Sequence, residues 1–329
     1  MSEDGAPVWV LLGHRTGDNK QLLRLACELG VPFRTIHIRY NRLHLLPPRL
    51  LGASLRSLTA ESREQIHRPW PRLVLGVGHR SVPVALAIRR LSRGRSKLVR
   101  LGNPRIDPSN FDLVVTTPQY RLPNRSNVIQ LPLGINTAAA AVEPTPDEAK
   151  WLASFPRPHR LLLIGGNTFM WELRPEKVAE AARRLRDRPD GTVIALRSGR
   201  TRKDVLDAVA DALKGGEHAV ASGRLPRYSV LVQDADEIFV TGDSVAMLSD
   251  AIASRKPVGI IEPDKSVTGW ALYALDSIGL RVPVRDIRQF WDEIRRQGLV
   301  GTLDEPTCGP VTTDSLSVAK TAVLELLAP

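Results

Sequence analysis

The first half of the chain contains two glycine-bearing segments whose side chains could perform acid–base chemistry. Residues 13–20 (GHRTGDNK) follow one apolar run, and residues 76–81 (GVGHRS) follow another. His14 and Asp18 can accept a proton from a hydroxyl group, so we interpret them as candidate general bases. The neighbouring residues that could shape a site or reach an anion are Gly13, Gly17, Asn19, His79 and Arg80. The alternative is that both segments are ordinary turns whose polar side chains cap the helices that follow.

Three segments of the second half have the composition of a phosphate-binding site. Each combines glycine with small polar or cationic residues: 163–168 (LIGGNT), 197–201 (RSGRT) and 241–244 (TGDS). Paired glycines allow successive backbone N–H groups to turn toward an anion, and arginine can bind two phosphate oxygens. The alternative for the arginine segment is a helix cap with solvated side chains. The residues that we predict to hold a nucleotide or nucleotide-sugar are Gly165, Gly166, Asn167, Thr168, Arg197, Ser198, Arg200, Thr201, Thr241, Gly242, Asp243, Ser244, Met247 and Asp250.

Other patterns in the sequence argue against metal, disulfide or serine-nucleophile chemistry. Asp234-Ala235-Asp236 has the spacing of a metal-holding pair, but it precedes an apolar run, whereas such a pair should follow one. The seven histidines are scattered, and two cysteines are too few for a cysteine-based zinc module. No Gly-x-Ser-x-Gly elbow and no Walker A loop is present. We therefore expect neither a metal ion nor a cofactor.

The elements that must position these segments alternate between strands and helices. Apolar runs predict strands at residues 8–12, 33–38, 73–77, 97–101, 113–116, 127–130, 160–164, 192–196, 237–240 and 258–261, with a short strand near 218. Helical periodicity predicts helices at residues 20–29, 82–91, 147–153, 175–186, 202–213, 245–254, 268–278, 287–297 and 313–327. This alternation is typical of parallel sheets covered on both faces, in which ligands bind at the carboxyl ends of the strands.

A change of composition divides the chain into two parts. Residues 137–159 carry an alanine run and several prolines between the two alternating regions. A length of 329 residues also suits two domains of ordinary size. We predict a first α/β domain at residues 1–140, a linker at 141–158, and a second α/β domain with C-terminal helices at 159–329.

The charge of the chain points to an anionic partner. Lys and Arg total 46 against 35 acidic residues, which gives a net charge of +11. A nucleotide, a phosphosugar or an acidic lipid surface would complement this charge. We expect no nucleic acid, because the sequence has no zinc finger, basic helical run or aromatic RNA-binding motif. The oligomeric state stays open.

Residues 40–58 (YNRLHLLPPRLLGASLRSL) combine leucine and arginine and contain no acidic residue. This composition suits the surface of an acidic membrane, although the segment could equally pack on the first domain. The first residues (MSEDG) lack the character of a signal peptide, and no apolar run approaches the length of a membrane span. We expect a cytoplasmic protein that can lie at the inner face of the cytoplasmic membrane.

The sequence resembles the mitochondrial fission ELM family and its bacterial homologues. Its Gly13-x-x-x-Gly17-Asp18-Asn19-x-Gln21 matches the opening of that family, and further similarity extends over residues 103–105, 111–115, 163–168, 195–201 and 241–251. Residues 118–121 (PQYR) depart from the family's Pro-x-His-Asp, so no role of that pair is carried over. The C-terminal 60 residues match only loosely.

The resemblance implies a GT-B architecture, with two Rossmann-like domains facing a central cleft. The second domain would hold a nucleotide-sugar donor and the first an acceptor, which His14 or Asp18 would deprotonate. Residues 241–257 also resemble the donor block of lipid-linked N-acetylglucosaminyltransferases, and by that likeness Asp250 would contact the ribose. The implied function is a metal-independent glycosyltransferase acting on cell-envelope glycan or lipid. A non-catalytic scaffold or membrane-surface adaptor, and a nucleotide-sugar epimerase, remain the alternatives.

Overall fold

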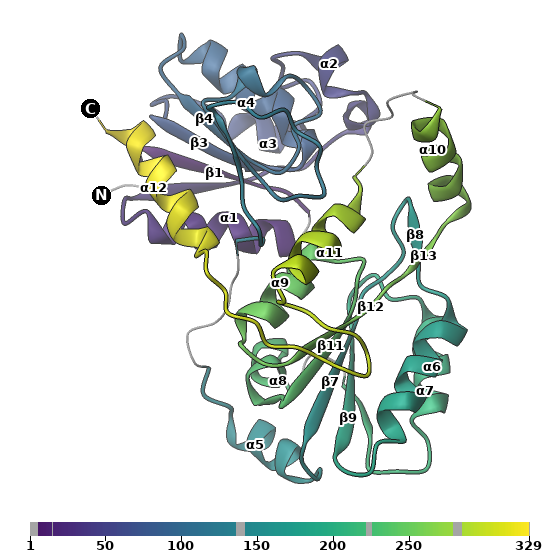
Figure 1. Ribbon diagram of the computed structural model, residues 1–329. Helices are drawn as coiled ribbons and strands as arrows, with labels where there is room; N and C mark the ends of the chain where they lie inside the picture. The colour runs from purple at the N-terminus through teal and green to yellow at the C-terminus, as the bar shows by residue number, and fades with distance from the viewer. Residues whose placement is uncertain (1–5, 15, 136–141, 222–225, 279–284, 329) are drawn as a thin grey trace. The chain divides into compact units, whose positions relative to one another are not determined.

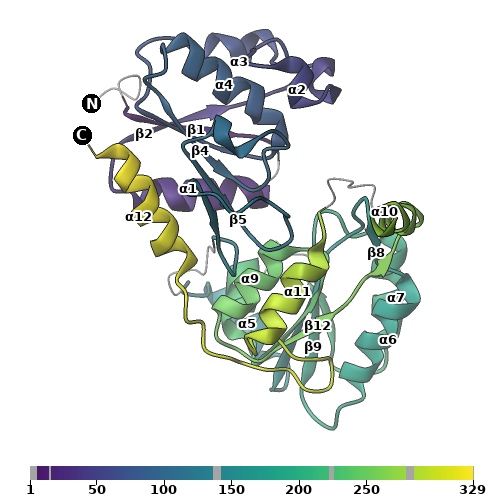
Figure 2. The same cartoon turned by 45° about the horizontal axis from the view of Figure 1, so that its top comes forward.

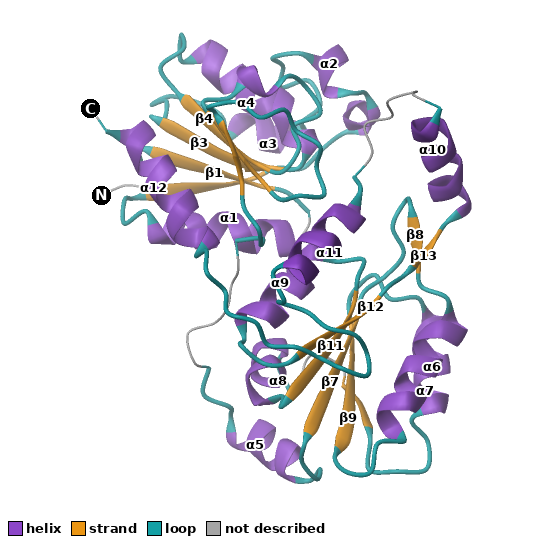
Figure 3. Ribbon diagram, in the orientation of Figure 1, coloured by secondary structure: helices purple, strands orange, loops and turns teal. Residues whose placement is uncertain are grey.

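The structure is a computed structural model that describes residues 6–14, 16–135, 142–221, 226–278 and 285–328. The chain forms two compact units, each built on a parallel sheet (Figure 1; strands in orange in Figure 3). Unit 1 contains residues 1–137 and 313–329, and unit 2 contains residues 138–312. The linker start that we expected at residue 141 lies outside the described residues.

Unit 1 has a six-stranded parallel sheet in the order β2-β1-β3-β4-β5-β6. Its strands are β1 (Val8–Leu12), β2 (Phe33–His37), β3 (Leu73–Val77), β4 (Lys97–Leu101), β5 (Leu113–Thr116) and β6 (Val128–Gln130). Its helices are α1 (Thr16–Glu28), α2 (Pro48–Leu51), α3 (Ala60–Glu64), α4 (Val82–Leu91) and α12 (Ser315–Leu327), with 3₁₀ turns η2 (Arg42–Leu45), η3 (His79–Ser81) and η4 (Pro108–Asn110).

Successive residues of a strand point to opposite faces of the sheet, and both faces of unit 1 are apolar. Val8, Val10 and Leu12 of β1 pack with α1 and α12 on one face. Trp9 and Leu11 pack with α4 on the other face. The sheet of unit 1 is therefore buried on both sides, and polar chemistry is confined to the strand ends.

Unit 2 has a five-stranded parallel sheet in the order β10-β9-β7-β11-β12 and a small antiparallel pair, β8 with β13. Its strands are β7 (His159–Ile164), β8 (Trp171–Glu172), β9 (Thr192–Arg197), β10 (Ala219–Ala221), β11 (Glu237–Thr241), β12 (Val258–Ile261) and β13 (Asp264–Lys265). Its helices are α5 (Pro146–Ala153), α6 (Pro175–Arg186), α7 (Lys203–Ala212), α8 (Tyr228–Asp234), α9 (Val245–Ala253), α10 (Val267–Ser277) and α11 (Ile287–Arg296). Helices α6 and α7 cover one face of the sheet, with a core of alanine, valine and leucine side chains.

The last helix belongs to unit 1 and not to the second domain, to which we had assigned it. We assigned residues 313–329 to the second domain, but α12 packs beside α1 in unit 1 (Figure 2). Ala319 and Val323 are fully buried in the core beneath α1, and the Ser315 hydroxyl donates to the Leu133 carbonyl at 3.0 Å. The chain therefore returns to unit 1 because its first sheet needs a second helix on that face.

Several local features differ from the expected elements. Helix α1 begins at Thr16 instead of residue 20, which places Asp18 in its first turn. Helix α8 and the β8–β13 pair were not predicted, because each is too short to show a clear period. Within the described residues, no helix is both long and apolar enough to cross a bilayer.

Candidate functional site

The strand order defines where a ligand could bind in each unit. In unit 1, β1 pairs with β2 on one side and β3 on the other, and the helices that follow β1 and β3 lie on opposite faces. In unit 2, β7 likewise pairs with β9 on one side and with β11 on the other. Ligands of open α/β sheets bind at the carboxyl ends of strands at such a switch point. The sequence segments that we selected lie at these strand ends.

Unit 1 has a small cavity of about 70 Å³ at its switch point. Its walls are the segments after β1 and β3, together with Tyr40, which follows β2. The residues that line it are Gly13, His14, Asp18, Asn19, Tyr40, Val77, Gly78, His79 and Arg80. The structure thus brings together both candidate bases and most of the predicted surrounding residues, with Gly17 next to Asp18 on α1.

Asn19 has a structural role that the sequence reading did not assign. Its side chain accepts from the N–H of Gly13 at 3.0 Å and donates to the carbonyl of the same residue at 2.7 Å. Both polar groups of the Gly13 backbone are therefore used within the β1–α1 loop. Asn19 therefore fixes the conformation of this loop.

The glycines around this cavity face open space. A Cβ atom added at Gly13, Gly17 or Gly78 would meet no atom within 4 Å. Gly78 also adopts a positive φ of 69°, which other residues rarely adopt. These glycines are therefore not required by close packing of the protein itself, and a ligand can approach their backbone.

The corresponding glycines of unit 2 are in the opposite situation, because the protein's own atoms fill their surroundings. A Cβ at Gly165 would overlap the carboxylate of Asp243, and one at Gly166 would overlap the backbone of Arg200. At Gly242 it would lie 3.0 Å from the ring of Trp291, whose Nε1–H donates to the Gly242 carbonyl at 2.8 Å. The absence of a side chain at these glycines therefore allows neighbouring segments of unit 2 to pack against their backbone.

A buried carboxylate organises the switch point of unit 2. Asp243 is 0% exposed at its side chain and accepts from the Gly166 N–H at 3.0 Å, the Thr241 hydroxyl at 2.8 Å and the Arg200 guanidinium at 2.9 Å. The Thr241 oxygen accepts from the Gly165 N–H at 2.8 Å. The structure therefore corrects the prediction of a phosphate nest at Gly165 and Gly166, because both N–H groups already donate to acceptors of the protein.

The arginine segment after β9 forms a self-contained turn. The Thr201 hydroxyl donates toward the Gly165 carbonyl at 2.6 Å and also accepts from the Ser198 N–H at 2.9 Å. Arg197 is exposed, and within the described residues its guanidinium has no hydrogen bond or ion pair. The side chain of Arg200 is 49% exposed although it pairs with Asp243. Arg197 and Arg200 therefore both present cationic surface at this edge.

The remaining donor candidates mostly support local turns. Asn167 accepts from the Leu173 N–H at 2.9 Å, and Thr168 accepts from the Trp171 N–H at 3.1 Å. This turn leads into β8, and the next helix, α6, begins at Pro175, as the sequence predicted. Ser244 is the N-cap of α9 and accepts from the Met247 N–H at 3.4 Å.

Asp250 lies on α9 and contacts a half-buried tyrosine. The Tyr228 hydroxyl donates to its carboxylate at 3.2 Å. Burial, together with this carboxylate, raises the pKa of Tyr228 well above its usual value. Asp250 is only partly exposed, so a ribose hydroxyl would share this carboxylate with Tyr228.

The Asp234-Ala235-Asp236 pair holds the start of β7. Asp234 lies 2.6 Å from Nδ1 of His159, and Asp236 accepts from the His159 N–H at 2.7 Å and from Arg157 at 2.8 Å. Both carboxylates precede β11, at the end of the sheet away from the predicted ligand sites. Their position gives them a structural function.

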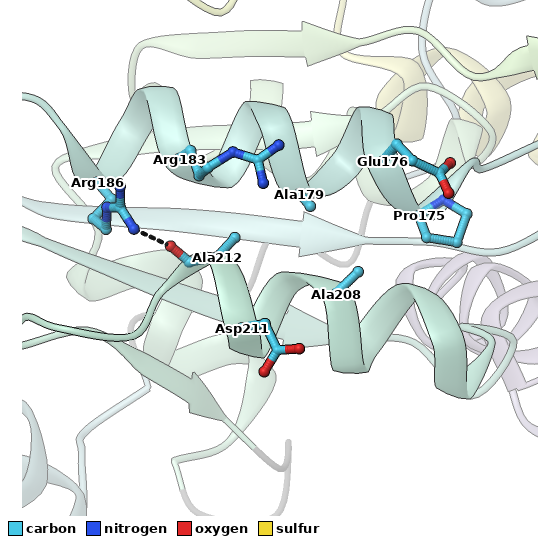
Figure 4. A pocket seen from close by; sticks show the side chains of 8 residues that line it. All are labelled: Pro175, Glu176, Ala179, Arg183, Arg186, Ala208, Asp211 and Ala212. Atoms are coloured by element: carbon cyan, nitrogen blue, oxygen red, sulfur yellow. Dashed lines mark hydrogen bonds between the residues drawn. The ribbon is translucent and has the colours of Figure 1, made fainter.

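A larger hollow of about 370 Å³ lies between α6 and α7, away from the strand ends (Figure 4). The hollow exists because the side chains that face it include small alanines, such as Ala179 and Ala208. Its cations are already engaged: Arg183 pairs with Glu180 at 3.0 Å, and Arg186 donates to the Ala212 carbonyl at 2.7 Å. We therefore assign no ligand to this groove.

Comparison with solved structures defines the class of fold. UDP-GlcNAc 2-epimerase from Neisseria meningitidis, bound to UDP-GlcNAc, is 12% identical; the match covers 97% of this chain and 99% of that chain, with a TM-score of 0.53. Sucrose-phosphate synthase from Thermosynechococcus elongatus is 13% identical, with coverage of 98% and 100% and a TM-score of 0.51. UGT89C1 of Arabidopsis thaliana complexed with UDP-L-rhamnose is 11% identical, with coverage of 98% and 95% and a TM-score of 0.52. The chain has the GT-B-like fold of glycosyltransferases and UDP-sugar epimerases.

The chain belongs to the family described as Mitochondrial fission ELM1, whose model matches residues 16–274. This range includes the segments after β3, β7, β9 and β11 and, from the segment after β1, residues 16–20, and it confirms the family resemblance seen in the sequence. A comparison with curated proteins found no match.

Arg100 is the site residue that the sequence reading missed. It lies in β4, is completely buried, and donates to the Ser81 hydroxyl at 2.8 Å next to the unit 1 cavity. The signal was a cation within the apolar run KLVRL, at a position where a sheet covered on both faces should contain an apolar side chain.

Proposed function

We propose that this chain is a GT-B-type transferase that uses a nucleotide-sugar donor and works without a metal ion. The observation that carries the proposal is the exposed cationic edge at the carboxyl end of β9, where Arg197 is the last residue of the strand and Arg200 lies in the turn after it. Helix α9 begins with Ser244 at the end of β11, in the same sheet. Cationic side chains and a helix N-terminus can stabilise the charge of a departing nucleoside diphosphate in place of a metal ion.

The role of Asp243 in this proposal is positional. Its carboxylate fixes the Arg200 guanidinium at 2.9 Å and ties the ends of β7 and β11 together. Arg200 would therefore contact the phosphate from a position fixed by Asp243, whereas Arg197 could change its conformation to reach the phosphate. Asp250 would accept a hydrogen bond from the ribose on the same unit.

The acceptor would bind at the cavity of unit 1. His14 and Asp18 both line it, and either carries a group that can take the acceptor's proton as the new glycosidic bond forms.

Two other functions compete with the transferase. The similar structures include a UDP-GlcNAc 2-epimerase, and an epimerase would need the same nucleotide site but no acceptor. A non-catalytic scaffold would need neither. Binding of a nucleotide or nucleotide-sugar, measured as thermal stabilisation of the purified chain, separates the scaffold from both enzymes, and product analysis with donor alone then identifies an epimerase.

We also propose that residues 40–58 form a loop that docks on an acidic membrane surface. The base of the loop is fixed: Tyr40 pairs with Leu58, and the Asn41 side chain donates to the Leu58 carbonyl at 3.0 Å. Its outer part presents apolar side chains, with Leu45 76% and Leu50 73% exposed. Three exposed arginines accompany them: Arg42, Arg49 and Arg56. The leucine side chains would insert into the bilayer interface, and the neighbouring arginines would bind acidic lipid head groups.

Replacing Leu45 and Leu50 together by serine is expected to reduce binding to vesicles with acidic lipid at least fivefold, because the inserted apolar area is lost. Flotation of the protein with vesicles of phosphatidylglycerol and phosphatidylcholine measures the bound fraction. Val318→Ser, which changes a partly exposed residue of α12, should bind as the unmodified chain does. Equal flotation of the double variant and the unmodified chain would contradict the proposal.

A further inference from the structure

Arg100 is a buried cation whose hydrogen-bonding capacity is largely unused. Its Nη1 donates to the Ser81 hydroxyl at 2.8 Å, whereas its Nε and Nη2 have no acceptor within the described residues. The side chain is 0% exposed. A buried charge is costly unless it is paired and hydrogen-bonded, so this guanidinium lacks a compensating anion.

The guanidinium lies against the turn that forms one wall of the unit 1 cavity. Arg100 is opposite Gly76 in the sheet, and a Cβ at Gly76 would lie 2.8 Å from Nη1. Ser81, the acceptor for Arg100, donates in turn to the Val77 carbonyl at 2.9 Å. Val77 and Gly78 line the cavity, so Arg100 stands directly behind its wall.

The ionisable neighbours do not neutralise this charge. Burial raises the pKa of Tyr40 to about 12, against the influence of Arg100 and Arg80, so the phenol is neutral at pH 7. Burial lowers the pKa of Arg100 to about 10, against Tyr40, Asp18 and Tyr120, so the guanidinium remains protonated. Asp18 acts on Arg100 through space, with no hydrogen bond between them.

The cavity itself has an excess of groups that attract an anion. Arg80, His79 and His14 line it, and Asp18 is the one carboxylate among its lining residues. With Arg100 behind the wall, two guanidinium groups lie near one carboxylate, so the surroundings of the cavity carry a net positive charge. This charge suits an anionic group, and the planar fork of arginine suits a group with several oxygens.

We propose that the cavity of unit 1 binds the phosphoryl group of a small molecule, with Arg100 as the buried anchor and Arg80 at the rim. The site is separate from the nucleotide site proposed on unit 2, but it is the cavity proposed above for the acceptor, so a phosphomonoester bound there would take the acceptor's place in the proposed function. Its ligand is either free phosphate or a phosphomonoester whose remaining part extends out of the cavity.

The test measures thermal unfolding of the full chain with inorganic phosphate, with glycerol 3-phosphate, and with acetate at matched ionic strength. Phosphate or the monoester should raise the unfolding midpoint by a few degrees at saturation, and acetate should not. Tighter binding of the monoester would identify the phosphoryl group of a larger molecule, and tighter binding of phosphate would identify the free ion. Absence of stabilisation by both probes would overturn the proposal.

Two variants connect the response to the anchor and the rim. Arg100→Met should abolish the response and raise the midpoint of the ligand-free chain, because an uncompensated charge leaves the interior. Arg80→Met, at a partly exposed position, should weaken phosphate binding about fivefold or more. If Arg100→Met does not fold, this variant alone tests whether the cavity binds phosphate. Arg90→Met, on the exposed side of α4, should respond as the unmodified chain does. An undiminished response in Arg80→Met or in a folded Arg100→Met would contradict the assignment. These readouts contain no nucleotide, so they are independent of the proposed transferase activity.

Discussion

Replacement of Asp243 by alanine is expected to lower the free energy of unfolding by about 3 kcal/mol, because several buried partners lose their acceptor together. The Gly166 N–H and the Thr241 hydroxyl would stay buried without it, and Arg200 would lose its ion pair. Urea unfolding measures the total effect. Hydrogen exchange of peptides covering residues 163–168 and 237–244 should show the loss concentrated at the carboxyl ends of β7 and β11.

Two further variants distinguish the loss of the Asp243 hydrogen-bond network from the loss of one negative charge. Asp243→Asn keeps the shape and one acceptor oxygen, so it should cost less than Asp243→Ala. Asp211→Ala removes an exposed carboxylate that pairs with Lys214 on the surface, and its effect should stay below about 0.5 kcal/mol. If Asp243→Ala unfolds within 0.5 kcal/mol of the unmodified chain, the buried carboxylate does not organise this switch point.

Replacement of Asp18 by asparagine is expected to reduce turnover by about 10²- to 10⁴-fold, the usual contribution of a general base. The variant keeps the shape of the side chain in the first turn of α1 and removes its ability to accept a proton. Release of nucleoside diphosphate from the donor measures turnover, and calorimetry measures donor affinity. The affinity should change less than twofold, because the proposed donor site is on unit 2.

The matched control for Asp18→Asn is Glu64→Gln, which changes an exposed carboxylate of α3 in the same unit. Its turnover should equal that of the unmodified chain. Loss of donor affinity in Asp18→Asn would place Asp18 in the donor site instead. Unchanged turnover with intact affinity would leave His14 as the candidate base.

Local patterns predicted most of the strands and several helices. The runs at β1, β3, β4, β5 and β12, and helices α4 and α6, have the bounds expected from the sequence. These elements are continuous apolar runs or strongly amphipathic stretches, so their period is decided by nearby residues alone. The position of α12 depends on which sheet lacks a covering helix, a tertiary requirement that no local pattern expresses.

The candidate site was predictable as a set of strand ends but not as a set of contacts. Glycine and polar residues after a strand indicate a functional turn, and the structure places all five segments at strand ends. Sequence cannot show whether a glycine admits a ligand or a neighbouring side chain. Gly78 faces open space, whereas Gly165 accommodates Asp243. The two cases look alike in sequence because both are glycine after an apolar run.

The measurement that tests the central claim most directly is thermal unfolding with UDP, GDP, ADP, CMP and the corresponding nucleotide-sugars, each with and without Mg²⁺. The account predicts that one nucleotide family stabilises the chain independently of Mg²⁺. A ligand at about 100 times its Kd adds about 2.7 kcal/mol, a shift of a few degrees. Arg197→Ala should reduce this shift, and Arg183→Ala on α6 should not. Absence of a shift with every nucleotide and nucleotide-sugar would contradict the transferase and epimerase functions alike and favour a scaffold.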